Sequence, residues 1–175
     1  NICSLYRAGK DEEWLYSVWE FCEGGDLQQV STKESGPLSE LRSRRIFVDC
    51  LRGLSYMHDC GYAHLDISME NIMIRGTDAV IIDFGMTQRI RTPDINRGCF
   101  GKRLYMHPTM FKHMAEFKNH RAMTGTWSAV ECDLWSLSVV LFVCVVGGPP
   151  WEWPSAQRDA RFRMIAVSGK LRSLL

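Results

Sequence analysis

Three polar side chains that suit phosphate chemistry occur close together near the middle of the sequence. Asp66 and Asn71 belong to the stretch HLDISMEN, and Asp83 begins the tripeptide Asp-Phe-Gly. The residues between these motifs read as a hairpin, because β-rich runs at 72–74 and 80–82 flank a turn. A hairpin brings its two ends together, so Asp66, Asn71 and Asp83 are predicted to converge.

This trio suits the transfer of a phosphoryl group. A carboxylate can position an attacking hydroxyl, while an amide oxygen and a second carboxylate hold Mg²⁺ against the phosphates. Taken singly, Asp66 and Asn71 read equally well as turn residues, and the Asp-Phe-Gly tripeptide reads as a hairpin end. Their joint occurrence in this order favours the catalytic interpretation.

The two motifs resemble the catalytic loop and the metal-binding loop of eukaryotic-type protein kinases. The resemblance implies that Asp66 is the catalytic base, that Asn71 and Asp83 hold Mg²⁺, and that ATP is the phosphate donor. The family usually has Arg where this chain has Leu65. The sequence His-Leu-Asp at 64–66, with Ser68 two residues after the Asp, also weakly resembles the divergent FIKK kinases of apicomplexan parasites.

The stretch EFCEGGDL resembles the hinge of a kinase. By that resemblance Trp19 is an unusually large gatekeeper, the backbones of Glu20 and Cys22 bond the adenine edge, Asp26 reaches the ribose hydroxyls, and Met73 forms the floor under the adenine. The residues implied at the ATP site are Trp19, Glu20, Cys22, Asp26, Glu70 and Met73.

A second set of residues is implied in a structural role. Leu5, His64 and Phe84 would stack as part of an internal spine anchored on Asp133, at the start of the helix DLWSLS. Ordinary core packing explains the same apolar residues, and an acidic residue also suits the first turn of a helix because of the helix dipole. These interpretations are compatible with one another.

The catalytic loop supplies no cation of its own. Ser/Thr kinases usually have Lys where this chain has Ser68, and they have a Thr contacting that Lys where this chain has Lys102. The two residue types look exchanged, so Lys102 is expected to reach the transferred phosphate. A solvated Lys in a basic loop is the alternative. Glu70 lacks the neighbouring Arg of tyrosine kinases, which indicates protein substrates with Ser or Thr acceptors.

The expected fold is α+β and kinase-like, with two small-lobe strands and a mainly helical large lobe. Residues 1–22 read as the end of the small lobe and the hinge, and 23–175 as a large lobe truncated before its last helices. The chain alone is therefore expected to be inactive. The predicted elements are strands at 4–8 and 14–21, a loop at 28–37, a helix from Ser39 to Asp59, an apolar helix from Asp133, and a helix at 155–168. The polar positions of the Ser39–Asp59 helix expected to face water are Arg42, Ser43, Arg45, Asp49 and Arg52.

Composition limits the other classes of protein. The 175 residues carry a net charge of +1 and seven cysteines without a Cys-x-x-Cys pair, so neither a disulfide framework nor a zinc site is expected. A reducing, cytoplasmic location is expected. The longest apolar run is too short to span a bilayer. No basic and aromatic residues interleave as in a nucleic-acid binder.

Two alternatives remain open. A pseudokinase, acting as an ATP-binding or scaffold module, would explain Leu65, Ser68 and Thr109 as signs of decay, whereas retention of Asp66, Asn71 and Asp83 together favours an enzyme. A small-molecule phosphotransferase of the aminoglycoside or choline kinase type shares the His-x-Asp loop. It lacks the Tyr-Met-x-Pro stretch and the Asp-x-Trp-Ser helix that this chain has.

Overall fold

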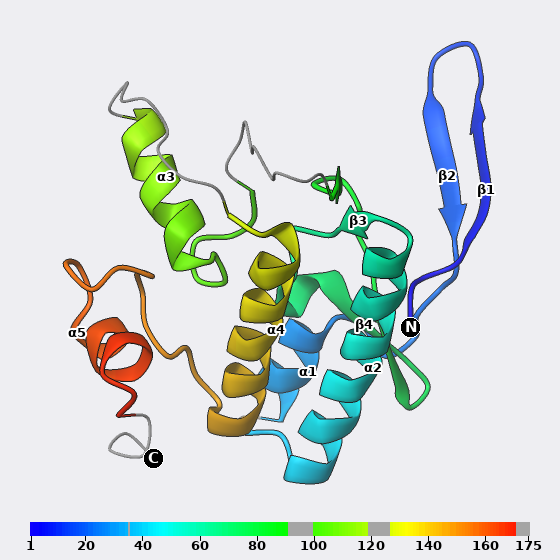
Figure 1. Ribbon diagram of the computed structural model, residues 1–175. Coiled ribbons are helices and arrows are strands. Elements are labelled where there is room, and N and C mark those ends of the chain that lie inside the picture. Colours follow the sequence, from blue (N-terminus) through cyan, green and yellow to red (C-terminus); the bar gives the residue numbers. More distant parts are fainter. Residues whose placement is uncertain (35, 91–99, 119–126, 171–175) are drawn as a thin grey trace.

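The computed structural model describes residues 1–34, 36–90, 100–118 and 127–170 (Figure 1). The helices and strands follow in chain order. They are β1 (Leu5–Lys10), β2 (Leu15–Trp19), α1 (Leu27–Lys33), α2 (Glu40–Asp59), β3 (Tyr62–Ala63), η1 (Met69–Asn71), β4 (Ile72–Arg75), β5 (Asp78–Ile81), β6 (Gln88–Arg89), α3 (Pro108–Lys118), α4 (Ala129–Val146), α5 (Ala160–Phe162) and η2 (Arg163–Val167). The predicted α+β arrangement, with paired strands and a mainly helical body, is confirmed.

Two long helices form the centre of the body. In Figure 1, α2 and α4 lie side by side, and they pack directly on one another. The predicted start of α2 is confirmed, because the Ser39 hydroxyl accepts a hydrogen bond from the N–H of Arg42. Gly61 follows the helix with φ 81°, a left-handed conformation that lets the chain turn sharply toward the next segment.

Three antiparallel strand pairs are found in the described residues. The predicted hairpin is formed by β4 and β5, with Ile72 opposite Ile81, and α2 packs on it. The β1–β2 hairpin projects away from the body (Figure 1), and its base is held where the N–H of Glu20 donates to the carbonyl of Ser4. The short β3–β6 pair lies beside the catalytic loop.

Two sequence predictions of secondary structure were wrong. The predicted loop at 28–37 begins with α1, because the Asp26 side chain caps the helix and Leu27 and Val30 become buried. The predicted helix at 155–168 is only the single turn α5 followed by the π-helical turn η2. The sequence pattern predicts Ala160, Phe162, Ile165 and Ala166 as its apolar positions. Of these only Phe162 is buried, so there is no continuous stripe to hold a longer helix.

The α4 helix is the apolar helix that the sequence predicts, but it begins at Ala129, four residues before the expected start at Asp133, because the Ser128 side chain caps it. By length and composition alone it could cross a membrane, but half of it is buried inside the protein, as in a core helix. Its N-cap is Ser128, and it ends at Gly147 with φ 81°. The burial of α4 therefore provides the surface against which the catalytic loop is held.

Two side chains of α2 that were expected to face water are buried. Ser43 is 1% and Asp49 is 5% exposed. An Asp49 oxygen accepts a hydrogen bond of 3.1 Å from the N–H of Ala79 on β5. The sequence prediction was wrong here because periodicity along α2 does not reveal that a strand N–H would need a partner on this face.

Asp49 is expected to stabilise the junction of α2 and β5. Asp49→Ala would leave the Ala79 N–H buried without an acceptor and lower the free energy of unfolding by about 1–3 kcal/mol. Arg52→Ala is the matched control, because Arg52 pairs with Asp49 at 3.3 Å from an exposed position, and it should cost less than about 0.5 kcal/mol. Equal losses for the two variants in urea unfolding would contradict this assignment.

Candidate active site

The catalytic loop is held by a buried carboxylate at the start of α4. Asp133 is 0% exposed and accepts hydrogen bonds from the backbone N–H groups of His64 (2.8 Å) and Leu65 (2.7 Å). A third donor is Nε2 of His58 on α2, at 2.8 Å. Leu65 has φ 65°, which a branched side chain rarely adopts. The carboxylate thus supports a strained backbone at the residue before Asp66.

His64 connects this loop to the end of the β4–β5 hairpin. Its Nδ1 accepts from the N–H of Asp66 at 3.2 Å, so the ring proton lies on Nε2, which donates to the Ile82 carbonyl at 3.0 Å. Ile82 in turn donates its own N–H to the Asn71 carbonyl at 3.0 Å. The ring therefore fixes the distance between Asp66 and the residue that precedes Asp83.

Asp66 and Asn71 are in direct contact. The Asn71 Nδ2 donates to Oδ2 of Asp66 and to its backbone carbonyl, both at 2.8 Å. Asp83 follows Ile82, so the hairpin places it beside Asn71 as the sequence predicts. Asp83 has φ 61°, and its Oδ1 accepts from the N–H of Gly85 at 3.2 Å. The amide fixes the carboxylate of Asp66, while the carboxylate of Asp83 is exposed.

The oxygen atoms of this group suit a magnesium ion. Both hydrogen bonds of the Asn71 amide use Nδ2, so its Oδ1 is available as a metal ligand. Asp83 offers Oδ2 as a second ligand from an exposed side chain. Amide and carboxylate oxygens are the ligands that Mg²⁺ takes in sites it shares with phosphates. Asn71 and Asp83 could therefore hold the ion.

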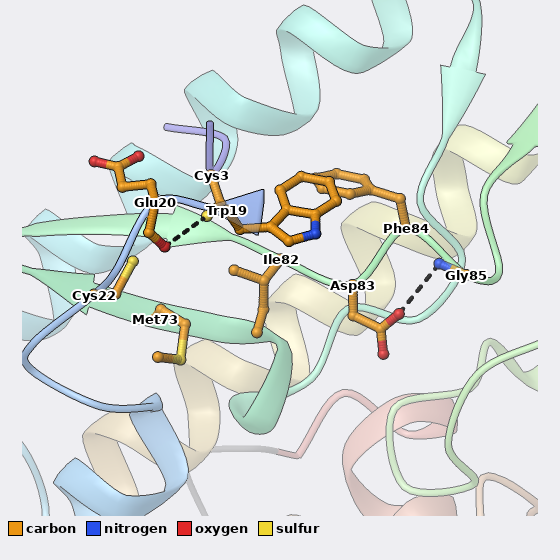
Figure 2. A pocket seen from close by; sticks show the side chains of 9 residues that line it. All are labelled: Cys3, Trp19, Glu20, Cys22, Met73, Ile82, Asp83, Phe84 and Gly85. Carbon is orange, nitrogen blue, oxygen red and sulfur yellow. Dashed lines mark hydrogen bonds between the residues drawn. The ribbon is translucent and has the colours of Figure 1, made fainter. Parts of the chain in front are cut away.

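A pocket of about 500 Å³ opens beside Asp83 (Figure 2). Four of the six residues predicted at an ATP site line it, namely Trp19, Glu20, Cys22 and Met73. The other lining residues are Cys3, Ile82, Asp83, Phe84 and Gly85. The sequence did not predict Cys3, Ile82 or Gly85 in this pocket, and Cys3 is brought there by the pairing of the chain start with β5.

Asp26 and Glu70 lie outside the residues that line this pocket. The carboxylate of Asp26 caps α1 by accepting from the N–H of Gln29 at 2.8 Å, and it also accepts from the side-chain amide of Gln29. Its backbone pairs with Met73, so it remains next to the pocket floor. Glu70 instead lies beside Lys102, at 3.4 Å.

The predicted stack of Leu5, His64 and Phe84 forms only in part. The Phe84 ring meets the edge of His64 at 5.6 Å and stacks on Trp19 at 5.9 Å. Leu5 lies opposite Trp19 in the β1–β2 ladder and is 49% exposed. The structure differs from the prediction because the larger Trp19 ring occupies the space against Phe84.

Lys102 reaches the catalytic loop. Its ammonium group donates to Oγ of Ser68 at 2.7 Å, and Ser68 is 0% exposed. Burial opposes ionisation of Glu70, but hydrogen bonds from its own N–H and from Ser68, together with the charge of Lys102, hold the pKa of Glu70 below its usual value. The Lys side chain stays 40% exposed, so it remains accessible to a phosphate.

Gly101 sets the position of Lys102. It has φ 85°, and a Cβ there would come within 2.8 Å of the Leu65 carbonyl. Glycine is thus required by both its conformation and its close approach to the catalytic loop. His58 and Gly101 are further contributors to which the sequence analysis assigned no role, although a Gly directly before a basic residue near a candidate site was a usable signal.

Asp133 is expected to dominate the stability of this site. Asp133→Ala would leave two backbone N–H groups buried without acceptors and lower the free energy of unfolding by about 3–5 kcal/mol. Asp133→Asn, which keeps one acceptor oxygen, should cost less. The control is Glu131→Ala, an exposed residue in the first turn of the same helix, for which a loss of about 0.3–1 kcal/mol is expected. A loss for Asp133→Ala no greater than the control's would refute this role.

Comparison with known proteins identifies the family. A model of the protein kinase domain matches residues 1–171. Similar proteins include serine/threonine-protein kinase PLK4 of Nematostella vectensis, 30% identical over 87% of this chain and 14% of that protein, and serine/threonine-protein kinase CHK1 of Saccharomyces cerevisiae, 27% identical over 98% and 32%. CDPK-related kinase 7 of Arabidopsis thaliana is 28% identical over 86% and 25%. The chain thus spans a third or less of the length of these relatives, and it belongs to the protein kinase family.

Proposed function

We propose that the full-length protein transfers the γ-phosphate of ATP to Ser or Thr hydroxyls of protein substrates. The observation that carries this proposal is the contact of Asp66 with Asn71, held beside Asp83 at the edge of the pocket. The names of the relatives, serine/threonine-protein kinases, support Ser and Thr as acceptors.

In this mechanism Asp66 orients the acceptor hydroxyl and takes its proton. The Asn71 amide donates to Oδ2 of Asp66 and fixes the orientation of the carboxylate. The other oxygen, Oδ1, is then the one that would accept the proton of the hydroxyl. A Mg²⁺ ion held by Asn71 and Asp83 would neutralise phosphate charge. Trp19 and Met73 would enclose the adenine, and the hinge backbone at Glu20 and Cys22 would bond its edge.

Lys102 would supply the cation on the phosphate side of the site. Its Nζ lies 2.7 Å from the hydroxyl of Ser68, two residues after Asp66, so the charge is placed at the catalytic loop although the residue comes from another segment. The Glu70 carboxylate contacts the same ammonium group at 3.4 Å, and the Lys102 side chain is still 40% exposed. We assign Lys102 to stabilisation of the transferred phosphate, with Ser68 as its positioning partner.

The proposed base is tested by Asp66→Asn in the full-length protein. This variant keeps the shape of the side chain but cannot take the proton, so kcat should fall about 10²–10⁴-fold while ATP binding is retained. Transfer of labelled phosphate from ATP to a Ser-containing protein measures kcat, and titration with Mg²⁺–ATP measures binding.

Asp59→Asn is the control, because Asp59 is exposed at the end of α2. If the unmodified full-length protein bound Mg²⁺–ATP but transferred no phosphate to any Ser or Thr substrate, the enzymatic proposal would be refuted in favour of a pseudokinase.

The role of Lys102 is tested by exchanging residue types. Lys102→Ala should lower kcat about 10²-fold, as for loss of one donor to transition-state charge. The double variant Ser68→Lys with Lys102→Thr should recover part of this loss, because it returns a cation to the loop. Lys112→Ala, an exposed position on α3, is the charge-matched control. Unchanged turnover of Lys102→Ala would exclude the assignment.

A further inference from the structure

Two cysteines line the pocket that the proposed function assigns to ATP. Cys3 lies just before β1, and Cys22 lies just after β2, in the hinge. They are 6% and 5% exposed, and both border the pocket (Figure 2). With Val80 they form a small apolar cluster, against which Met73 packs. Two segments separated along the chain thus bring two thiols together at one cavity wall.

The two thiols lie in the same small cluster. The Cys3 thiol donates to the carbonyl of Glu20, two residues before Cys22, at 3.6 Å. Burial raises the pKa of Cys3 and the Cys22 side chain opposes that rise, whereas the Cys3 side chain adds to the rise that burial causes in the pKa of Cys22. A disulfide needs Cβ atoms about 4 Å apart, a separation that side chains packed in one cluster can reach.

We infer that Cys3 and Cys22 are a redox-active pair in the nucleotide pocket, which a peroxide converts to a disulfide. The inference rests on the proposed function only in assigning ATP to this pocket. The thiol pair itself stands on the shared cavity, the shared apolar cluster and the contact of the Cys3 thiol with the Glu20 carbonyl in the hinge.

The reaction balances with hydrogen peroxide as the oxidant. The Cys3 thiolate attacks one peroxide oxygen, the O–O bond breaks, and hydroxide leaves to take a proton as water. The resulting sulfenic acid is then attacked at sulfur by Cys22, which loses its proton, and the S–O bond breaks with release of a second water. Two thiols are oxidised by two electrons and one peroxide is reduced.

Burial makes this reaction dependent on pH. Burial raises the pKa of the Cys3 thiol and is the main cause that raises the pKa of Cys22 to about 11. The thiolate, which is the nucleophile, is therefore scarce at neutral pH. As long as the pH is below the pKa, the thiolate fraction rises about tenfold when the pH rises by one unit. Oxidation should be slow at pH 7 and about tenfold faster at pH 8.

Another cysteine pair provides an internal control. Cys50 on α2 and Cys144 on α4 lie near one another, but they are 0% and 2% exposed in the main core. A small oxidant can enter the pocket beside Cys3 without unfolding the protein, whereas the core pair needs local opening. Cross-linking under native conditions should therefore be confined to Cys3 and Cys22.

Peptide mapping without reduction tests the pair directly. After peroxide treatment of the folded chain, the peptides of Cys3 and Cys22 should be joined and lighter by two hydrogen atoms, and the cross-link should form about tenfold faster at pH 8 than at pH 7. In Cys22→Ser the sulfenic acid at Cys3 should persist and react with dimedone. Cys50→Ser should cross-link like the unmodified chain. Absence of the joined peptides, or their formation only after unfolding, would overturn the inference.

Nucleotide protection separates this inference from the proposed function. In the full-length protein, saturating Mg²⁺–ATP should slow cross-linking, because an adenine in the pocket would cover both sulfurs. A cross-link whose rate is indifferent to bound ATP would leave the thiol pair standing and refute the pocket assignment. ATP binding without any cross-link would refute the thiol pair and leave the proposed function intact.

Discussion

The arrangement of the active site depends on one buried carboxylate. An isolated charge at the 0% exposed position of Asp133 would be prohibitively costly, and it is tolerated because three donors surround it, from His64, Leu65 and His58. The same bonds support Leu65 in its left-handed conformation. Because Asp133 belongs to α4, which packs on α2, these bonds fix the backbone immediately before Asp66.

From this anchor the order of the site spreads through backbone groups. The ring of His64 bonds the carbonyl of Ile82, and the N–H of Ile82 bonds the carbonyl of Asn71, so the two motifs are joined at the open end of the β4–β5 hairpin. The Asn71 amide then orients Asp66. Leu65 takes part in this network through its backbone N–H, which explains how a Leu can replace the usual Arg at this position.

Local patterns in the sequence predicted the hairpin, α2, and the convergence of Asp66, Asn71 and Asp83, because each depends on residues close in the chain. The misjudged burial of Asp49, exposure of Leu5 and position of Cys3 depend on distant partners. Asp49 is buried because a strand N–H lies over it, and Leu5 is displaced because Trp19 sits opposite on a neighbouring strand. Likewise, Cys3 reaches the pocket through pairing of the chain start with β5, which no local pattern encodes.

The location of the proposed cation couples chemistry to the docking of a second segment. Lys102 follows Gly101, whose close approach to the Leu65 carbonyl leaves no room for a Cβ. Three residues later, Tyr105 is 6% exposed, and its carbonyl accepts a hydrogen bond of 2.8 Å from the Ser136 hydroxyl on α4. A Lys within the catalytic loop would be present whether or not this segment were docked. A Lys at 102 arrives only when the segment is seated, so under the proposed mechanism its docking is a chemical requirement for phosphate transfer.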